Sequence, residues 1–92
     1  MRSFEFVKVD ESARKHGLKD EEIRYAVRHP FGFQQTLGNP EKPTFAFVGP
    51  RHEGGSPHNA IEVIVAKRAD GFLHAFHAMP FTDRWRHLLY RR

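Results

Sequence analysis

The sequence contains no cysteine, and this absence excludes several kinds of chemistry at once. Disulfides, iron–sulfur clusters, thiol catalysis and cysteine-based zinc sites all need a side chain that the chain does not have. Long apolar runs are also lacking, since the longest one, residues 72–82, falls far short of the ~20 residues of a membrane-spanning helix. Serine occurs only at positions 3, 12 and 56, without a Gly-x-Ser-x-Gly motif, so nucleophilic serine catalysis is not expected.

The composition is that of a small globular protein. The chain has 92 residues, of which 39% are hydrophobic and 28% are charged. This length predicts a single domain over residues 1–92 with a core too small for a large enclosed cavity. The first residues lack the apolar core of a signal peptide, so we expect an intracellular, cytoplasmic protein with no membrane partner.

Positive charge is concentrated at the end of the chain. The formal net charge is +4, and the last eleven residues hold four arginines against one aspartate. These arginines are the candidate nucleic-acid-binding residues: Arg84, Arg86, Arg91 and Arg92. A basic patch of this kind suits a polyanion or an acidic partner protein, although it can equally serve solubility.

Hydrophobic periodicity divides the chain into short strands and helices. Strands are expected over residues 4–9, 44–48, 60–67 and 72–79, with a further edge strand over 32–37. Helices are expected over 11–16, over 21–29 and from residue 82 or 83 onward. Because short loops join the strands, we predict an α+β fold, with a small antiparallel sheet, helices on one face and the main elements in the order βααβββα.

Several residues are expected to fix the ends of these elements. Asp10 and Asp20 are suited to cap the first two helices, and Gly17 is suited to end the first of them. Residues 69–71 are expected to form a tight hairpin turn. The last helix carries an apolar stripe at helical spacing, made of Phe81, Trp85, Leu88 and Leu89.

The chain is rich in histidine, with seven in all, but their spacing does not predict a metal site. His52 and His58 lie in a glycine-rich loop whose spacing is not that of a helical zinc site. His74 and His77 are three positions apart on one expected strand, so their side chains should point to opposite faces. Small Ala75 beside His77 leaves room for a ligand on an open sheet face, which allows a small-molecule enzyme as one alternative.

A set of cations, imidazoles and one tyrosine matches the needs of RNA cleavage without a metal or cofactor. That reaction needs a base for the 2′-hydroxyl proton, an acid for the leaving oxygen and cations for the phosphate. The residues that supply these groups are Lys15, His16, His77, Arg84, Arg86 and Tyr90.

One segment of the chain resembles a known family. The run Ala13-Arg14-Lys15-His16-Gly17, followed by Leu18-Lys19-Asp20-Glu21-Glu22, is similar to the Arg-Lys-His-Gly segment of BrnT-type toxins. Those are small basic ribonucleases of type II toxin–antitoxin systems with a RelE-like fold. The later order also matches: a strand ending in Val48-Gly49, a glycine-containing loop, a hairpin, and Phe76-His77-Ala78 leading into an arginine-rich helix that closes with Tyr90.

The resemblance implies a metal-independent endoribonuclease that an antitoxin protein neutralises. Lys15 and His16 match the family segment. In the ribonuclease hypothesis the catalytic residues are Lys15, His16, His77 and Arg84: Lys15 and Arg84 bind the phosphate of the RNA, and His77 or His16 acts as the acid or base. Glu22 also matches the family segment.

The chain departs from the family pattern at the end of the last strand. The family has Ser-Ala followed by two arginines there, where this chain has His77-Ala78-Met79-Pro80. A non-catalytic module that binds nucleic acid or protein on the same fold therefore remains an alternative.

Overall fold

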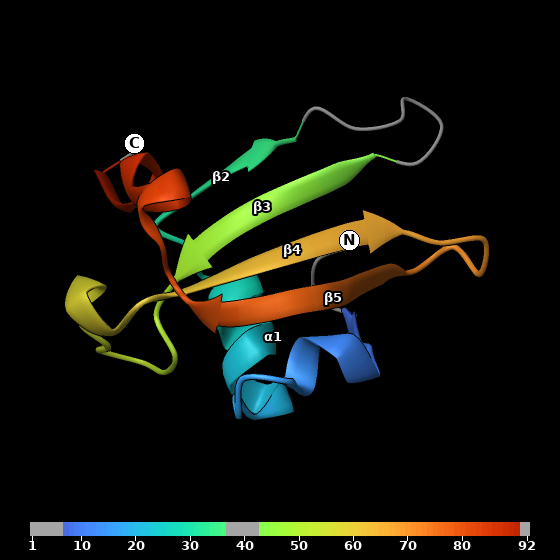
Figure 1. Cartoon of the computed structure of the whole chain (residues 1–92), viewed down its shortest axis with the longest axis horizontal. Helices are drawn as coiled ribbons and strands as arrows, with labels where there is room; N and C mark the ends of the chain where they lie inside the picture. The colour runs from blue at the N-terminus through green and yellow to red at the C-terminus, as the bar shows by residue number, and fades with distance from the viewer. Residues whose placement is uncertain (1–6, 37–42, 91–92) are drawn as a thin grey trace.

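A computed structural model describes residues 7–36 and 43–90, and its described strands form one five-stranded sheet in the order β1-β5-β4-β3-β2 (Figure 1). The strands are β1 (Lys8–Val9), β2 (Gly32–Gln35), β3 (Thr44–Gly49), β4 (Ile61–Lys67) and β5 (Leu73–Pro80). The helices are α1 (Asp20–Arg28) and three 3₁₀ helices, η2 (Glu11–Arg14), η3 (Pro57–Asn59) and η4 (Asp83–Tyr90). The α+β class predicted from the sequence is confirmed.

The sheet is mixed rather than wholly antiparallel. Strands β2 to β5 pair antiparallel, as predicted, but β1 pairs parallel to β5 through Lys8 opposite His74 and Val9 opposite Ala75. Tight hairpins produce only antiparallel pairs, and β1 meets β5 after most of the chain has intervened. The edge strand expected over residues 32–37 is present as β2 (Gly32–Gln35) at one edge of the sheet, a strand that the order βααβββα did not count. The expected strand residues Phe4, Phe6 and Leu37 lie outside the described residues.

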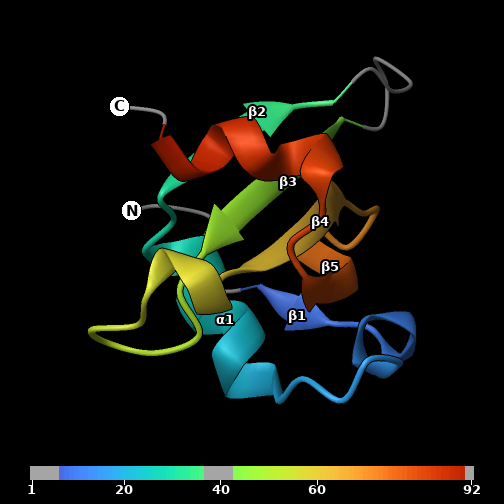
Figure 2. The ribbon, with the colours of Figure 1, turned by 60° about the vertical axis from the view of Figure 1, so that its left-hand side comes forward.

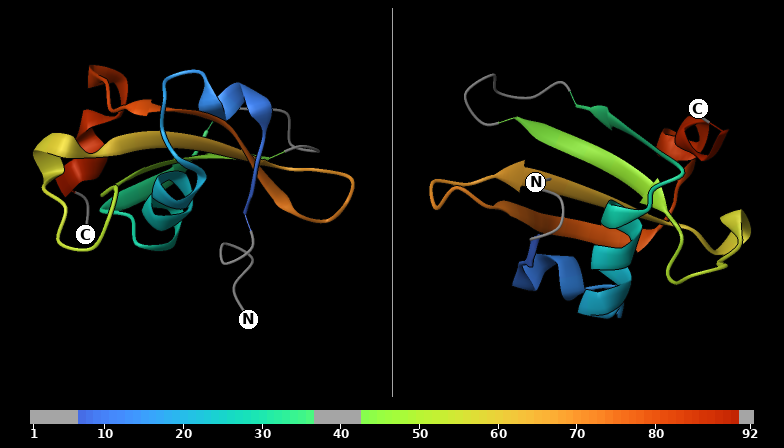
Figure 3. Two further views of the ribbon diagram at one scale, coloured as in Figure 1. Left: turned by 90° about the horizontal axis from the view of Figure 1, so that it is seen from below. Right: turned by 180° about the vertical axis from the view of Figure 1, so that it is seen from behind.

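The helices cover both faces of the sheet, which corrects the prediction that they share one face. Helix α1 lies behind the sheet in Figure 1 and in front of it in the right panel of Figure 3, where the molecule is seen from behind. On this α1 face, Phe47 packs with Ile23 and Val27. On the opposite face, Val48 packs with Leu88 of η4. Neighbouring residues of β3 thus face opposite ways and both are buried, so each face needs a cover.

The two apolar faces explain the position of η4. Figure 2 shows this helix running along the edge of the molecule near β2 and β3, away from α1. The predicted stripe is confirmed, because Trp85, Leu88 and Leu89 are buried and Phe81 packs against them. We call this side of the sheet the η4 face. No helix within the described part of the chain is long and apolar enough to span a membrane.

The helix starts differ from those expected. The Asp10 side chain makes no capping bond to η2, and the N-cap of α1 is Lys19 rather than Asp20. The Glu22 carboxylate instead accepts a hydrogen bond from the Lys19 amide at 2.8 Å. Both aspartates accept hydrogen bonds from charged side chains instead, because such bonds are stronger than a bond from a backbone amide. Asp20 accepts two hydrogen bonds from Arg14, at 2.8 and 2.9 Å.

Candidate functional site

The strongest candidate site is built around a buried carboxylate on the η4 face. Glu62 of β4 is 3% exposed, and it is the one charged residue buried to this extent among those described. One carboxylate oxygen accepts hydrogen bonds from the amide and the hydroxyl of Thr82, at 2.8 and 2.7 Å. The other oxygen contacts Nε2 of His77 at 2.8 Å. Three bonds therefore hold this carboxylate in one orientation, which compensates for its burial.

This contact fixes how His77 can act. An ionised carboxylate only accepts hydrogen bonds, so Nε2 of His77 must carry the proton. In the neutral ring, Nδ1 is then the acceptor nitrogen. Nδ1 of His77 has no hydrogen-bond partner within residues 7–36 and 43–90, and the side chain is 34% exposed. A carboxylate that orients an imidazole and stabilises its protonated form is a recurring arrangement for a general base.

A second histidine lies next to the first. The rings of His16 and His77 are 6.3 Å apart between centroids and meet edge to face. His16 follows η2, which continues from β1 along the side of β5 opposite to β4, where Ser12 donates to the carbonyl of Phe76. Gly17 directly afterwards has a φ of +78°, a conformation that glycine adopts at little cost, and the chain turns there toward α1. The fold thus brings together two of the residues predicted from the sequence.

A β-bulge in β5 determines which side chains share the η4 face. Ile64 pairs with His77, Val65 with Ala75 and Ala66 with His74, so Phe76 is an extra residue on β5. Because Ile64 and Ala66 share a face, His74 and His77 share it too. The prediction that these histidines point to opposite faces is therefore wrong, since it assumed unbroken alternation.

The same bulge separates Ala75 from His77. Ala75 is fully buried in the core cluster on the α1 face, opposite to His77. The small-molecule alternative relied on Ala75 leaving room beside His77, and Ala75 does not do so because it is buried on the α1 face. The room beside His77 lies on the η4 face, and Ala75 does not line it.

A groove of about 930 Å³ opens beside His77 on the η4 face. His77 and Arg84 both line it, so a third predicted residue adjoins the site. The Arg84 guanidinium stacks 4.9 Å from the ring of Trp85. Residues of β2, β3, β4, β5 and η4 line this groove. Most of its lining therefore belongs to regular secondary structure.

The other predicted residues are less closely tied to the site. Lys15 precedes His16 and is exposed. Arg86 is exposed and forms an ion pair with Asp83. Arg91 and Arg92 lie outside the described residues, as does the side chain of Tyr90.

Glu62 and Thr82 are functional candidates that the sequence analysis missed. A signal for Glu62 was present, because a lone acid interrupts the apolar run from Ile61 to Ala66. A charged residue in a strand covered on both faces needs a partner. The sequence gives no indication that this partner is His77 together with Thr82.

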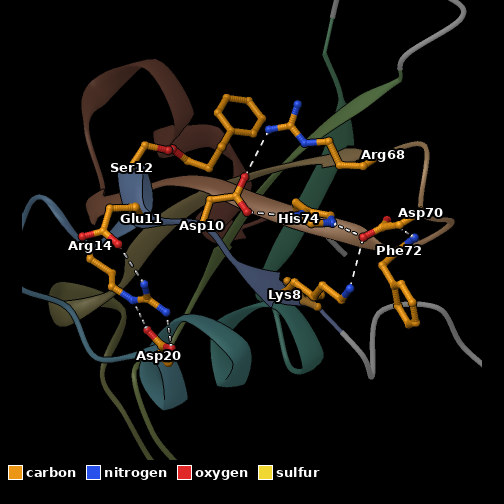
Figure 4. Close-up of polar contacts among 12 residues, drawn as sticks. Lys8, Asp10, Glu11, Ser12, Arg14, Asp20, Arg68, Asp70, Phe72 and His74 are labelled. Carbon is orange, nitrogen blue, oxygen red and sulfur yellow. Dashed lines mark hydrogen bonds and ion pairs between the residues drawn. The ribbon is translucent and has the colours of Figure 1, made fainter.

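A second polar cluster ties β1 to the hairpin that joins β4 and β5 (Figure 4). Nδ1 of His74 contacts Asp10 at 2.8 Å, and Nε2 contacts Asp70 at 2.9 Å. Arg68 also bonds to Asp10, and Lys8 to Asp70. Both ring nitrogens of His74 can donate to these carboxylates only when the ring is protonated, so the cluster favours the cation. Both ring nitrogens are also engaged in contacts within the fold.

This environment moves the pKa values of all three groups. Hydrogen bonds to Asp10 and to Asp70 raise the pKa of His74 above its usual 6.5. Burial works to raise the pKa of Asp10, but its bonds from His74 and Arg68 outweigh burial and lower it. The backbone amide of Phe72, followed by His74, lowers the pKa of Asp70.

The His74 cluster predicts a pH dependence of stability. A raised folded pKa stabilises the protein fully below about pH 6.5, and this contribution is lost as the pH rises through the folded value. The lowered pKa values of Asp10 and Asp70 cause the opposite loss as the pH falls below about 3.8. Thermal unfolding should therefore show a melting temperature that declines above pH 6.5.

A His74→Gln variant should be less stable than the wild type near pH 6 and should show a flatter decline above it. His58→Gln, in the exposed loop, is the matched control and should follow the wild-type curve. Equal slopes in His74→Gln and the wild type would contradict this assignment.

The described residues contain no group of three or more side chains arranged to hold a metal. His52 and His58 are both exposed in the loop between β3 and β4.

Comparisons with known proteins give no relative for this chain. No protein-family model matches the sequence, no curated protein matches it, and no solved structure matches the fold.

Proposed function

We propose that this protein is a metal-independent endoribonuclease of the BrnT-like toxin type, inhibited by an antitoxin. The observation that supports this most is the His16–His77 pair, with its rings 6.3 Å apart and Glu62 bound to one of them. The resemblance of the segment around Lys15-His16-Gly17 to that family is a second, independent support.

The two histidines divide the proton transfers of RNA cleavage between them. Nδ1 of His77 accepts the proton of the 2′-hydroxyl, and the 2′-oxygen forms a bond to phosphorus. The bond from phosphorus to the 5′-oxygen breaks, and protonated His16 supplies the proton to that oxygen. The products are a 2′,3′-cyclic phosphate and a free 5′-hydroxyl, so no water or metal is consumed in this step.

Two cations are available to stabilise the phosphate. Arg84 lines the same groove as His77, and Lys15 is adjacent to His16 in the chain. Charge develops on the phosphate oxygens in the transition state, where fixed cations contribute most. Glu62 acts through His77 and is a positioning residue, because it orients the ring without touching RNA.

Induced expression in bacteria tests this proposal. The wild type should arrest growth and degrade cellular RNA, and a Lys15→Ala, His77→Ala double variant should do neither. Production of both proteins must be equal on an immunoblot. Normal growth with intact RNA in cells that make soluble, folded wild type would contradict the proposal.

A second candidate function is a non-catalytic nucleic-acid-binding module. One observation favours it: Met79 and Pro80 end β5, where the family pattern has two arginines. Binding without cleavage that weakens steeply with salt would support this function, because counterion release drives contacts to phosphate.

A further inference from the structure

The η4 face carries a continuous groove that the chemistry of the histidine pair does not need. The groove beside His77 shares Thr44 and Phe76 with a second groove of about 880 Å³, which extends toward Arg68. Together they run from the β4–β5 hairpin to η4. A single catalytic phosphate would fill only a small part of this space.

The lining combines flat apolar surface with hydrogen-bonding groups. Phe76 and Ile64 are half-buried and lie near the middle of the groove. Gln34 of β2 faces them across the groove, and its amide oxygen contacts Nε2 of His87 at 2.6 Å. This bond holds the amide in one orientation, and amides recognise bases through hydrogen bonds to their edges.

The charge of the groove favours an anionic chain. Arg84 lies at one end. Toward the other end, the half-exposed Arg68 guanidinium lies 5.7 Å from the Phe76 ring while also bonded to Asp10 at 3.2 Å. Glu62 is the one acidic residue in the lining, and it is buried and already bonded to His77 and Thr82. Proteins that bind single-stranded nucleic acid commonly combine an aromatic side chain, on which a base stacks, with cations that contact the phosphates.

We infer that this groove binds single-stranded RNA next to the cleaved phosphate and selects its base. A base stacks on Phe76 and the Gln34 amide contacts the edge of a base. Arg84 contacts the cleaved phosphate, and Arg68 contacts a flanking phosphate. The inference rests on the proposed ribonuclease function, because it places the substrate strand across the histidine pair.

Trp85 permits a direct binding test, since it lines the groove and is the only tryptophan in the chain. The probes are 2′-O-methyl RNA hexamers of each single base, which have no free 2′-hydroxyl and cannot be cleaved. We expect saturable quenching of Trp85 fluorescence that differs among the four hexamers and weakens with salt.

Two variants locate the binding site. Phe76→Ser should weaken binding about ten-fold, as loss of one stacked base typically does. Phe33→Ser is the matched control, because Phe33 is an exposed aromatic residue that stacks on Phe47 of the α1 face. Gln34→Ala should reduce the differences in affinity among the four hexamers.

The outcomes separate this inference from the proposed function. No saturable quenching at low salt, equal losses in Phe76→Ser and Phe33→Ser, or equally tight binding of duplex RNA would overturn the groove inference, whether or not RNA is cleaved. Binding with the expected variant pattern but no cleavage of ordinary RNA would support the groove and contradict the ribonuclease proposal. Should Phe76→Ser fail to fold, Gln34→Ala provides the test, and unchanged differences in affinity among the four hexamers would overturn the groove inference.

Discussion

Replacing His77 by alanine is expected to slow RNA cleavage by about 100- to 10,000-fold, the usual contribution of a general base. The reason is geometric, because His77 alone among the described histidines combines a carboxylate partner on Nε2 with an open Nδ1 and a second imidazole nearby. Single-turnover cleavage of a labelled RNA in the presence of EDTA measures the loss.

Two further variants make the measurement specific. His58→Ala removes an exposed histidine from the loop between β3 and β4 and should keep the wild-type rate. Glu62→Gln keeps the shape of the side chain but removes the charge that stabilises protonated His77. It should lower kcat and leave KM unchanged, because Glu62 does not contact RNA. A wild-type rate in His77→Ala would remove this residue from the mechanism.

Replacing Gly49 by alanine is expected to cost about 3 kcal/mol of stability, the upper part of the range for overpacking. A Cβ at this position would lie 2.6 Å from the carbonyl oxygen and 3.0 Å from the Cα of Ala26 in α1. These are backbone atoms, so the clash is relieved only if α1 moves away from the end of β3. The free energy of unfolding of a 92-residue domain is about 5–14 kcal/mol, so this loss is a large part of the total.

Chemical denaturation of Gly49→Ala should show a lower midpoint at an unchanged slope. Gly17→Ala is the matched control for the added methyl group. Gly17 has a φ of +78° but no atom within 4 Å of a built Cβ, so it should lose only about 1 kcal/mol from backbone strain. Equal losses at the two positions would show that α1 and β3 do not pack as closely as the structure has them.

Much of the local structure could be predicted from the sequence because its signals are local. The apolar stripe of Trp85, Leu88 and Leu89, the Gly17 turn and the hairpin at Gly71 all depend on neighbouring residues. The parallel pairing of β1 with β5 and the second covered face depend on contacts between distant segments. Periodicity within one segment carries no information on such contacts.

The site was predictable only in part. The sequence predicts the chemical groups of the site, namely Lys15, His16, His77 and Arg84. The fold places His16 beside His77, and it places Arg84 on the same groove as His77. The orientation of His77 depends on one extra residue, Phe76, in β5. A bulge of this kind reverses the alternation that any strand prediction assumes, so neither the Glu62 contact nor the shared face of His74 and His77 could be predicted.

The central claim is that His16 and His77 act together on one RNA phosphodiester without a metal. The most direct test is the chemistry of the RNA ends that the purified protein produces in EDTA. We expect 2′,3′-cyclic phosphate and 5′-hydroxyl ends, which should be absent in both His16→Ala and His77→Ala. Cleavage that requires a divalent metal, or that leaves 5′-phosphate ends, would contradict it.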